Sequence, residues 1–233
     1  KDNREALGAL ATALEEAGRP EEAAGIYQQM VDLAPNHPYG HYRLAGALLA
    51  LKRYREAQAH LFEALRGDPR NVRVLLALGQ AYEGTRETGL AEKSYRQALE
   101  RDPASLEARF FLARIHQARG EDDEALRLYR EVLSADGARD SPAARALFVH
   151  TRTQVGLIHL LNKRYEDALE FLGQAYRAGG DPSADLFVLL GRTYIEAGRA
   201  GDAWKVLSEG REKYPDDPDL AALEGEIHLR ESR

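Results

Sequence analysis

The sequence predicts an all-α array of repeated helix pairs, and three observations support this fold class. Prolines recur at intervals of 34 residues, at Pro35, Pro69 and Pro103. Small side chains recur at a fixed distance before each proline, at Ala11, Ala45 and Gly79. A fixed period of this length is the mark of a repeat architecture. No segment alternates apolar and polar residues long enough for a strand, so we expect no β-sheet.

The repeated columns of residues have a physical interpretation. Small residues are expected where two antiparallel helices approach each other closely. Bulky residues recur sixteen positions later, where a helix fills the space beside its partner, at Tyr27, Leu61 and Tyr95. Neither helix of a pair can bury its apolar side alone, so each repeat depends on its neighbours for stability.

The pattern continues to the end of the chain with one interruption. Gly137 and Gly180 occupy the place of the proline in the fourth and fifth repeats and are 43 residues apart, so about nine extra residues separate these repeats. We therefore predict one domain over residues 1–233, made of six repeats, an insertion and a capping helix. We expect the six repeats at 4–37, 38–71, 72–105, 106–139, 149–182 and 184–217. The insertion lies at 140–148 and the capping helix at 218–231.

Turn residues agree with this register. Gly18, Gly120 and Gly198 stand at one offset in three repeats, where a left-handed residue can end the first helix. Ser141 and Pro142 form a helix-starting pair, which predicts an over-long helix from about Pro142 to about Asn162. This helix could form an added wall of a binding groove or an edge on which a partner docks. Alternatively, the insertion has no function and the array accommodates it.

The 34-residue period, the small-residue columns and the closing prolines resemble the tetratricopeptide repeat family over nearly the whole chain. The resemblance implies a right-handed superhelical solenoid. It also implies that the first helix of each repeat lines a concave groove, where partner-binding side chains stand at fixed offsets.

Carrying those offsets over gives a set of candidate groove residues that mixes aromatic, aliphatic and cationic side chains: Tyr39, Tyr42, Arg73, Leu76, Gln80, Phe110, Arg114, His150, Leu157 and Arg192. Aromatic rings provide stiff contact area and arginine can bind a carboxylate with two hydrogen bonds. The mixture favours a protein or peptide as the ligand. The alternative is that individual members pack against the neighbouring first helix instead.

Composition narrows the partner classes. The net charge is −6 and the isoelectric point is about 5.7, which argues against nucleic acid and against anionic membrane surfaces. No apolar stretch is long enough to span a bilayer, so we expect no direct membrane insertion by this segment. The chain has no cysteine, which excludes disulfides and thiolate metal sites. Because it begins with Lys1, we expect a mature form or an excised piece.

No residue pattern suggests catalysis, so we expect neither enzymatic activity nor a cofactor. His37 and His41 have the spacing of a metal pair, but Pro38 places His37 in a turn and no third ligand follows. The acidic run at residues 121–124 opens a second helix, where negative charge suits the helix dipole. We interpret this run as a solvated cap.

Three hypotheses for function remain. The first is a non-enzymatic adaptor that captures a partner peptide or helix in the groove. The others are a self-associating homo-oligomeric scaffold and a regulatory domain of a larger, membrane-anchored or enzymatic protein. The carboxylate clamp that some family members use for chaperone tails is not expected, because only Arg73 among its positions is chemically suitable.

Overall fold

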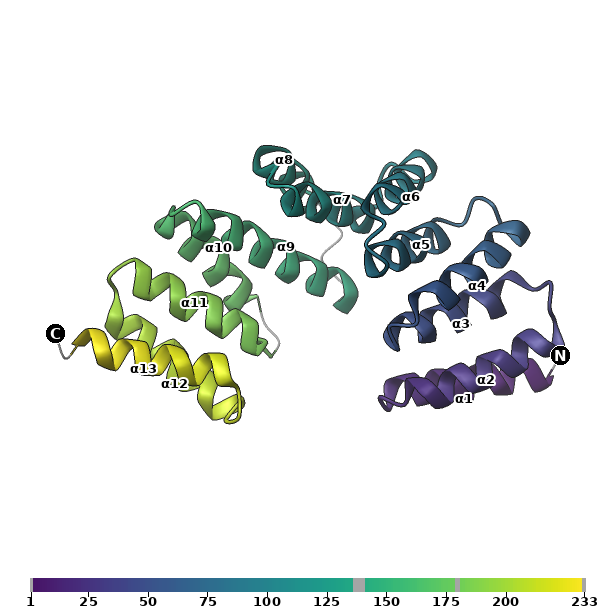
Figure 1. The fold of residues 1–233 in the computed structure, drawn as a ribbon, viewed down its shortest axis with the longest axis horizontal. Helices are drawn as coiled ribbons and strands as arrows, with labels where there is room; N and C mark the ends of the chain where they lie inside the picture. Colours follow the sequence, from purple (N-terminus) through teal and green to yellow (C-terminus); the bar gives the residue numbers. More distant parts are fainter. Residues whose placement is uncertain (1, 136–140, 179–180, 232–233) are drawn as a thin grey trace. The chain divides into compact units, whose positions relative to one another are not determined.

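The computed structural model describes residues 2–135, 141–178 and 181–231, and every regular element among them is an α-helix (Figure 1). The prediction of an all-α fold is confirmed. In chain order the helices are α1 (Asp2–Glu16), α2 (Pro20–Leu33), α3 (Pro38–Ala50), α4 (Tyr54–Gly67), α5 (Val72–Gly84), α6 (Thr88–Arg101), α7 (Leu106–Ala118), α8 (Asp122–Leu133), α9 (Pro142–Leu161), α10 (Tyr165–Arg177), α11 (Ala184–Glu196), α12 (Ala200–Lys213) and α13 (Pro218–Glu231).

The expected pairing is seen between α1 and α2, α3 and α4, α5 and α6, α9 and α10, and α11 and α12, and α13 packs on the last pair as a single helix. The apolar side of α13 is buried through Leu220, Leu223 and Ile227. Gly137 and Gly180, which were expected to close the fourth and fifth repeats, lie outside the described residues. The exact bounds of the six repeats stay a prediction.

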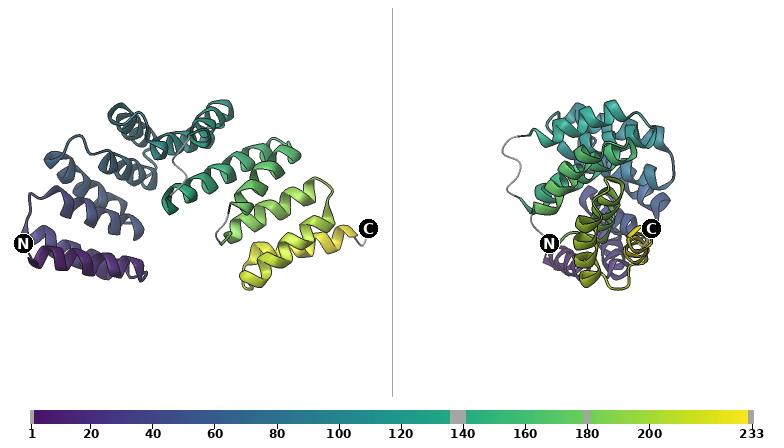
Figure 2. Two further views of the ribbon diagram at one scale, coloured as in Figure 1. Left: turned by 180° about the vertical axis from the view of Figure 1, so that it is seen from behind. Right: turned by 90° about the vertical axis from the view of Figure 1, so that its left-hand side faces the viewer.

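The chain forms two compact units, Lys1–Ile115 and His116–Arg233, with the boundary inside α7. Figure 2 shows the helices of the chain in two further views. Each unit has its own apolar clusters. In the first unit a large cluster includes Tyr27, Leu44 and Leu61; in the second unit one cluster surrounds Phe187. The expectation of one domain over residues 1–233 stays a prediction.

The small-residue column marks close helix contacts, as expected. A Cβ atom added to Gly79 of α5 would lie 2.2 Å from Cε1 of Tyr95 in α6. A Cβ added to Gly191 of α11 would lie 2.5 Å from Cδ2 of Leu207 in α12. Both distances are far shorter than a van der Waals contact, so only glycine allows these helix pairs to approach this closely.

The bulky column divides the repeats into two chemical classes. In three repeats a fully buried tyrosine donates its hydroxyl hydrogen bond to the residue twelve positions earlier, in the pairs Tyr27 with Glu15 (3.0 Å), Tyr95 with Glu83 (2.5 Å) and Tyr129 with Gln117 (2.8 Å). In the other three repeats both positions are apolar, in the pairs Leu61 with Leu49, Leu172 with Leu160 and Leu207 with Ile195. A buried hydroxyl needs a partner, which accounts for this joint change.

All six repeats use one turn between their two helices. Gly18, Gly120 and Gly198 have φ values of 69°, 75° and 72°, which confirms the predicted left-handed conformation. The other three repeats adopt it with charged residues, Lys52 (φ 57°), Arg86 (φ 63°) and Lys163 (φ 58°). The sequence patterns did not identify these three positions, because lysine and arginine are not turn signals.

Helix α9 has the predicted length. It covers 20 residues, whereas the first helices α3, α5, α7 and α11 cover 13 each. The Ser141 hydroxyl oxygen accepts a hydrogen bond from the Ala144 amide at 3.1 Å, and Pro142 occupies the first turn. The prediction of an over-long helix that begins at this pair is confirmed.

Candidate functional site

The first unit exposes a mixed polar and apolar surface on its first helices. Tyr39 of α3 is 48% exposed, Tyr42 is half-buried, and on α5 Arg73 and Gln80 are exposed beside the half-buried Leu76. These five residues were all expected at the groove. Their exposure is compatible with a contact surface that buries aromatic area and offers an arginine.

Arg43 holds Tyr39 in place. Its guanidinium donates hydrogen bonds to the Tyr39 hydroxyl at 3.0 Å and to the Glu15 carboxylate at 2.6 Å, as well as to the Tyr27 hydroxyl. Burial opposes the charge of Arg43, but the hydrogen bonds and negative charges around it prevail and raise its pKa above the ordinary value. The Tyr39 ring is thus anchored to a permanently charged group, which limits its loss of freedom on binding.

A hollow of about 730 Å³ opens between α1, the end of α2 and the start of α3, and we call it the α1 hollow. Its floor is formed by small side chains of α1 together with Met30, and Tyr39 stands at its side. The small residues that create the space are Gly8, Ala9, Thr12 and Ala13.

A second hollow of about 900 Å³ opens between α9, the end of α10 and the start of α11, and we call it the α9 hollow. Its apolar lining includes Val149 and Leu157 of α9 and Val188 and Leu189 of α11. His150 lines it as well. The structure therefore brings together two of the predicted groove residues, His150 and Leu157, around one concave surface.

The two hollows occupy equivalent places in the repeat. Gly8 and Thr153 are both the fifth residue of their repeats, and Met30 and Ala175 stand at the same position near the end of the second helix. Each hollow is bounded by the first helix of one repeat and the start of the next first helix. The recurrence of a concavity at equivalent positions in separate units indicates a property of the repeat rather than a local defect of packing.

The remaining predicted residues have different surroundings. The Phe110 side chain is only 8% exposed and lies edge-on to Phe111, with ring centroids 5.6 Å apart. This burial favours the alternative that Phe110 packs against its neighbours, and its role in partner binding stays a prediction. Arg114 is exposed and donates a hydrogen bond to Glu83 at 3.3 Å, while Arg192 is exposed on α11 and lines neither hollow.

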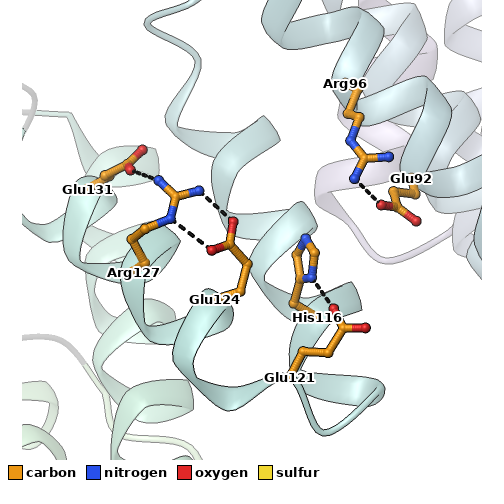
Figure 3. Close-up of polar contacts among 7 residues, drawn as sticks. All are labelled: Glu92, Arg96, His116, Glu121, Glu124, Arg127 and Glu131. Atoms are coloured by element: carbon orange, nitrogen blue, oxygen red, sulfur yellow. Dashed lines mark hydrogen bonds and ion pairs between the residues drawn. The ribbon is translucent and has the colours of Figure 1, made fainter.

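The acidic run at the start of α8 is engaged in local ion pairs (Figure 3). Glu121 contacts Nδ1 of His116 at 2.5 Å, and Arg127 bridges Glu124 and Glu131. The hydrogen bond from Arg127 holds the pKa of Glu124 below its ordinary value. Glu121 and Glu124 thus have partners within the protein, and Asp122 accepts a hydrogen bond from the Asn162 side chain at 2.7 Å.

Trp204 of α12 meets His228 of α13 edge-on, with ring centroids 4.9 Å apart. Trp204 remains 39% exposed, so it is a boundary residue rather than a core residue.

Among the residues that the structure describes, no group of three or more His, Cys, Asp and Glu side chains could hold a metal ion. Within the same ranges, no helix combines the length and apolar character needed to cross a membrane.

Comparison with known families decides what the helix pairs are. Residues 14–64, 87–148 and 159–227 match the tetratricopeptide repeat, and a second description of this repeat matches residues 42–91. The chain belongs to the tetratricopeptide repeat family. Proteins built from these repeats act as scaffolds for protein–protein interaction through the extended surfaces that the stacked repeats create.

Solved tetratricopeptide repeat structures resemble the whole chain in fold. PilF of Pseudomonas aeruginosa is 16% identical with a TM-score of 0.71, and the similarity covers 97% of this chain and 98% of that one. PilW, described as a type IV pilus biogenesis factor, is 16% identical with a TM-score of 0.77, covering 96% and 99% of the two chains. The quorum sensor NprR from B. thuringiensis is 14% identical with a TM-score of 0.77, covering 94% and 68%. No curated protein matches this chain in sequence.

Proposed function

We propose that this protein is a non-enzymatic adaptor that holds a segment of a partner protein against the first helices of its repeats. The observation that carries the proposal is the recurrence of a concave surface at equivalent repeat positions, in the α1 hollow and in the α9 hollow. Both hollows combine apolar floors with charged groups at their edges. Such surfaces suit a peptide or helix that buries a few side chains and keeps its polar groups paired.

The anchored aromatic surface of the first unit supports the same function. Tyr39 and Tyr42 offer rigid contact area, and the exposed Arg73 on α5 can pair with a carboxylate. Truncation of such residues commonly weakens binding by more than about 1 kcal/mol when they lie centrally in an interface. Assembly of a larger complex is the setting we propose to examine first, since the pilus biogenesis factor PilW shares the fold.

The absence of cysteine makes a direct test available. A single cysteine placed by Gln80→Cys on α5 can carry a photo-crosslinker, and captured proteins can be identified by mass spectrometry. We expect crosslinks to one segment of a partner, and we expect their loss when Tyr42→Ala and Arg73→Glu are added without a change in melting temperature. The matched control is Lys93→Cys on the second helix α6, which is also exposed. Capture of the same segment from this control position would contradict the proposal.

Self-association is the second candidate function, and one observation favours it. Leu229 of α13 is 68% exposed, and a Cβ added to Gly225 would meet nothing within 4 Å, so the last helix leaves an open surface. Light scattering at high protein concentration tests this alternative. A monomer would exclude the scaffold, and a dimer lost on Leu229→Asp would support it.

A further inference from the structure

Two histidine side chains face each other across the contact between α3 and α4. Nδ1 of His41 lies 3.0 Å from Nδ1 of His60, and the ring centroids are 5.3 Å apart with an interplanar angle of 31°. The rings therefore meet edge to edge through these two nitrogens. The sequence spacing pairs His41 with His37, but His37 is exposed in the turn before α3, so the structure gives His41 a different neighbour.

A single proton lies between the two nitrogens. Nε2 of His41 lies 2.8 Å from the Pro35 carbonyl oxygen, which only accepts hydrogen bonds, so Nε2 carries the proton of this ring. The lone pair on Nδ1 of His41 then points toward His60, whose Nδ1 supplies the proton between the rings. A histidine that ligates a metal is commonly held in this way, with its other ring N–H donated to a carbonyl oxygen. His41 thus already has the orientation and tautomer of a metal ligand.

The surroundings of the pair favour the neutral rings that metal binding requires. His41 is buried, and burial together with the neighbouring ring lowers the pKa of His60. A protonated imidazole has no lone pair to donate, so a lower pKa widens the pH range in which a metal can bind. The carboxylates of Glu56 and Glu63 on α4 oppose this shift, and their negative charge favours a cation beside the ring.

The distance between the nitrogens suits one bound ion. Two imidazole nitrogens that each lie about 2.0 Å from an ion, and subtend an angle of about 100° there, are about 3 Å apart. An ion can therefore replace the proton between His41 and His60 when the rings tilt, without separation of α3 from α4. The displaced proton is then carried by Nε2 of His60, which keeps that ring neutral.

The remaining coordination positions are open to solvent. His60 is only half-buried, so an ion reaches the pair from the side of this ring. Glu56 and Glu63 supply negative charge nearby, but each carboxylate is already paired with an arginine. Within the described parts of the chain no third His, Cys, Asp or Glu completes a ligand set, so water fills the open positions.

We propose that His41 and His60 form a two-histidine site for a divalent transition-metal ion that joins α3 to α4. Imidazole ligands suit Cu²⁺, Ni²⁺ and Zn²⁺, and a given nitrogen site binds Cu²⁺ most tightly of the three. An ion held only by the folded chain stabilises the fold, so the melting temperature should rise with the metal concentration. This site lies outside the proposed adaptor function and does not depend on it.

Titration of the intact chain with Cu²⁺, followed by calorimetry and electron paramagnetic resonance, tests the inference. We expect the tightest site to hold one ion per chain with two nitrogen ligands, and to bind Zn²⁺ more weakly. His60→Gln removes one ligand, while the new amide can still donate a hydrogen bond to Nδ1 of His41. This variant should bind Cu²⁺ at its tightest site at least about tenfold more weakly.

Two control variants separate the pair from the other histidines. His37→Gln and His150→Gln each remove an exposed ring and leave His41 and His60 in place. Both should bind Cu²⁺ as the original chain does. Equal binding by His60→Gln would overturn the inference. Equal weakening by all three variants would also overturn it, because that result indicates scattered binding to surface histidines.

A second measurement needs no substitution and covers the case in which His60→Gln does not fold. In NMR spectra of the histidine rings of the original chain, Zn²⁺ should shift the signals of His41 and His60 at the lowest concentrations. Shifts confined to the other histidines, or no shift of any ring, would overturn the inference.

Discussion

At the scale of single residues, the turn between the two helices of each repeat has two solutions. Three repeats place glycine in the left-handed conformation, and Lys52, Arg86 and Lys163 adopt it in the others. A side chain in this conformation costs roughly 1–2 kcal/mol because its Cβ crowds the following carbonyl. The helix-ending hydrogen bonds, such as that from the Arg53 amide to the Leu48 carbonyl at 2.9 Å, maintain the turn despite that cost.

Replacing Lys52 with glycine is therefore expected to stabilise the protein. Relief of the left-handed strain exceeds the added chain entropy of glycine in the unfolded state, which leaves a net gain of roughly 0.5–1 kcal/mol. Urea denaturation followed by circular dichroism measures the change. Lys93→Gly in the exposed middle of α6 is the control and should lose about 1 kcal/mol. A lower urea midpoint for Lys52→Gly would refute the strain argument.

At the scale of helices, close approach depends on the absence of single Cβ atoms. Gly79 lies against the ring of Tyr95, whose hydroxyl donates to Glu83 at 2.5 Å. The ring is held at both ends and cannot swing aside. Gly46 of α3 differs completely, since a Cβ added there meets nothing within 4 Å.

These two glycines make a matched pair of predictions. Gly79→Ala should destabilise the protein by about 1–3 kcal/mol, because α5 and α6 must separate to admit the methyl group. Gly46→Ala should stabilise it by roughly 0.5–1 kcal/mol, because the added methyl restricts the unfolded chain without a clash. Thermal denaturation compares the two variants, and changes of the same sign would contradict the packing described for Gly79.

The contact between α3 and α4 includes a pair of histidines whose protonation is restricted. His41 is 6% exposed, and its Nε2 lies 2.8 Å from the Pro35 carbonyl oxygen, so Nε2 carries the proton. Its Nδ1 then accepts from Nδ1–H of His60 at 3.0 Å. Burial and the neighbouring His41 lower the pKa of His60, although the carboxylates of Glu56 and Glu63 oppose the shift.

This pair predicts a loss of stability in mild acid. Because the pKa of His60 is lower in the folded state than the ordinary value of about 6.5, the unfolded chain binds more protons as pH falls. The stabilisation is complete above about pH 6.5 and is lost as pH falls through the folded pKa. Melting temperatures between about pH 7 and pH 5 should therefore decline less steeply for His60→Gln than for the original chain.

The control for this titration is Gln29→Ala, which changes an exposed side chain of α2 that carries no ionisable group. It should keep the pH dependence of the original chain. The melting temperature of His60→Gln should still decline with falling pH, because burial also lowers the pKa of His159. An unchanged slope for His60→Gln would exclude His60 as a source of the pH dependence.

At the scale of the whole molecule, the sequence predicted the helix pairs well because their contacts repeat every 34 residues and are local. The columns at Gly79 and Tyr95, the turns at Gly18 and the long helix from Pro142 all follow from residues near one another in the chain. The candidate binding surface was predicted less completely. The burial of Phe110 and the depth of the α9 hollow depend on distances between elements, which no single repeat specifies.

Each repeat pairs either a tyrosine with a polar acceptor or a leucine with an aliphatic residue. This pairing constrains how a gene for such an array can be rearranged. A genetic crossover inside a repeat can join a second helix bearing Tyr95 to a first helix that carries Leu49 where Glu83 stands. The hydroxyl would then be buried without an acceptor, at a cost of about 1–3 kcal/mol. A crossover between repeats keeps each pair together. The smallest unit that can be duplicated or exchanged safely is therefore the whole hairpin.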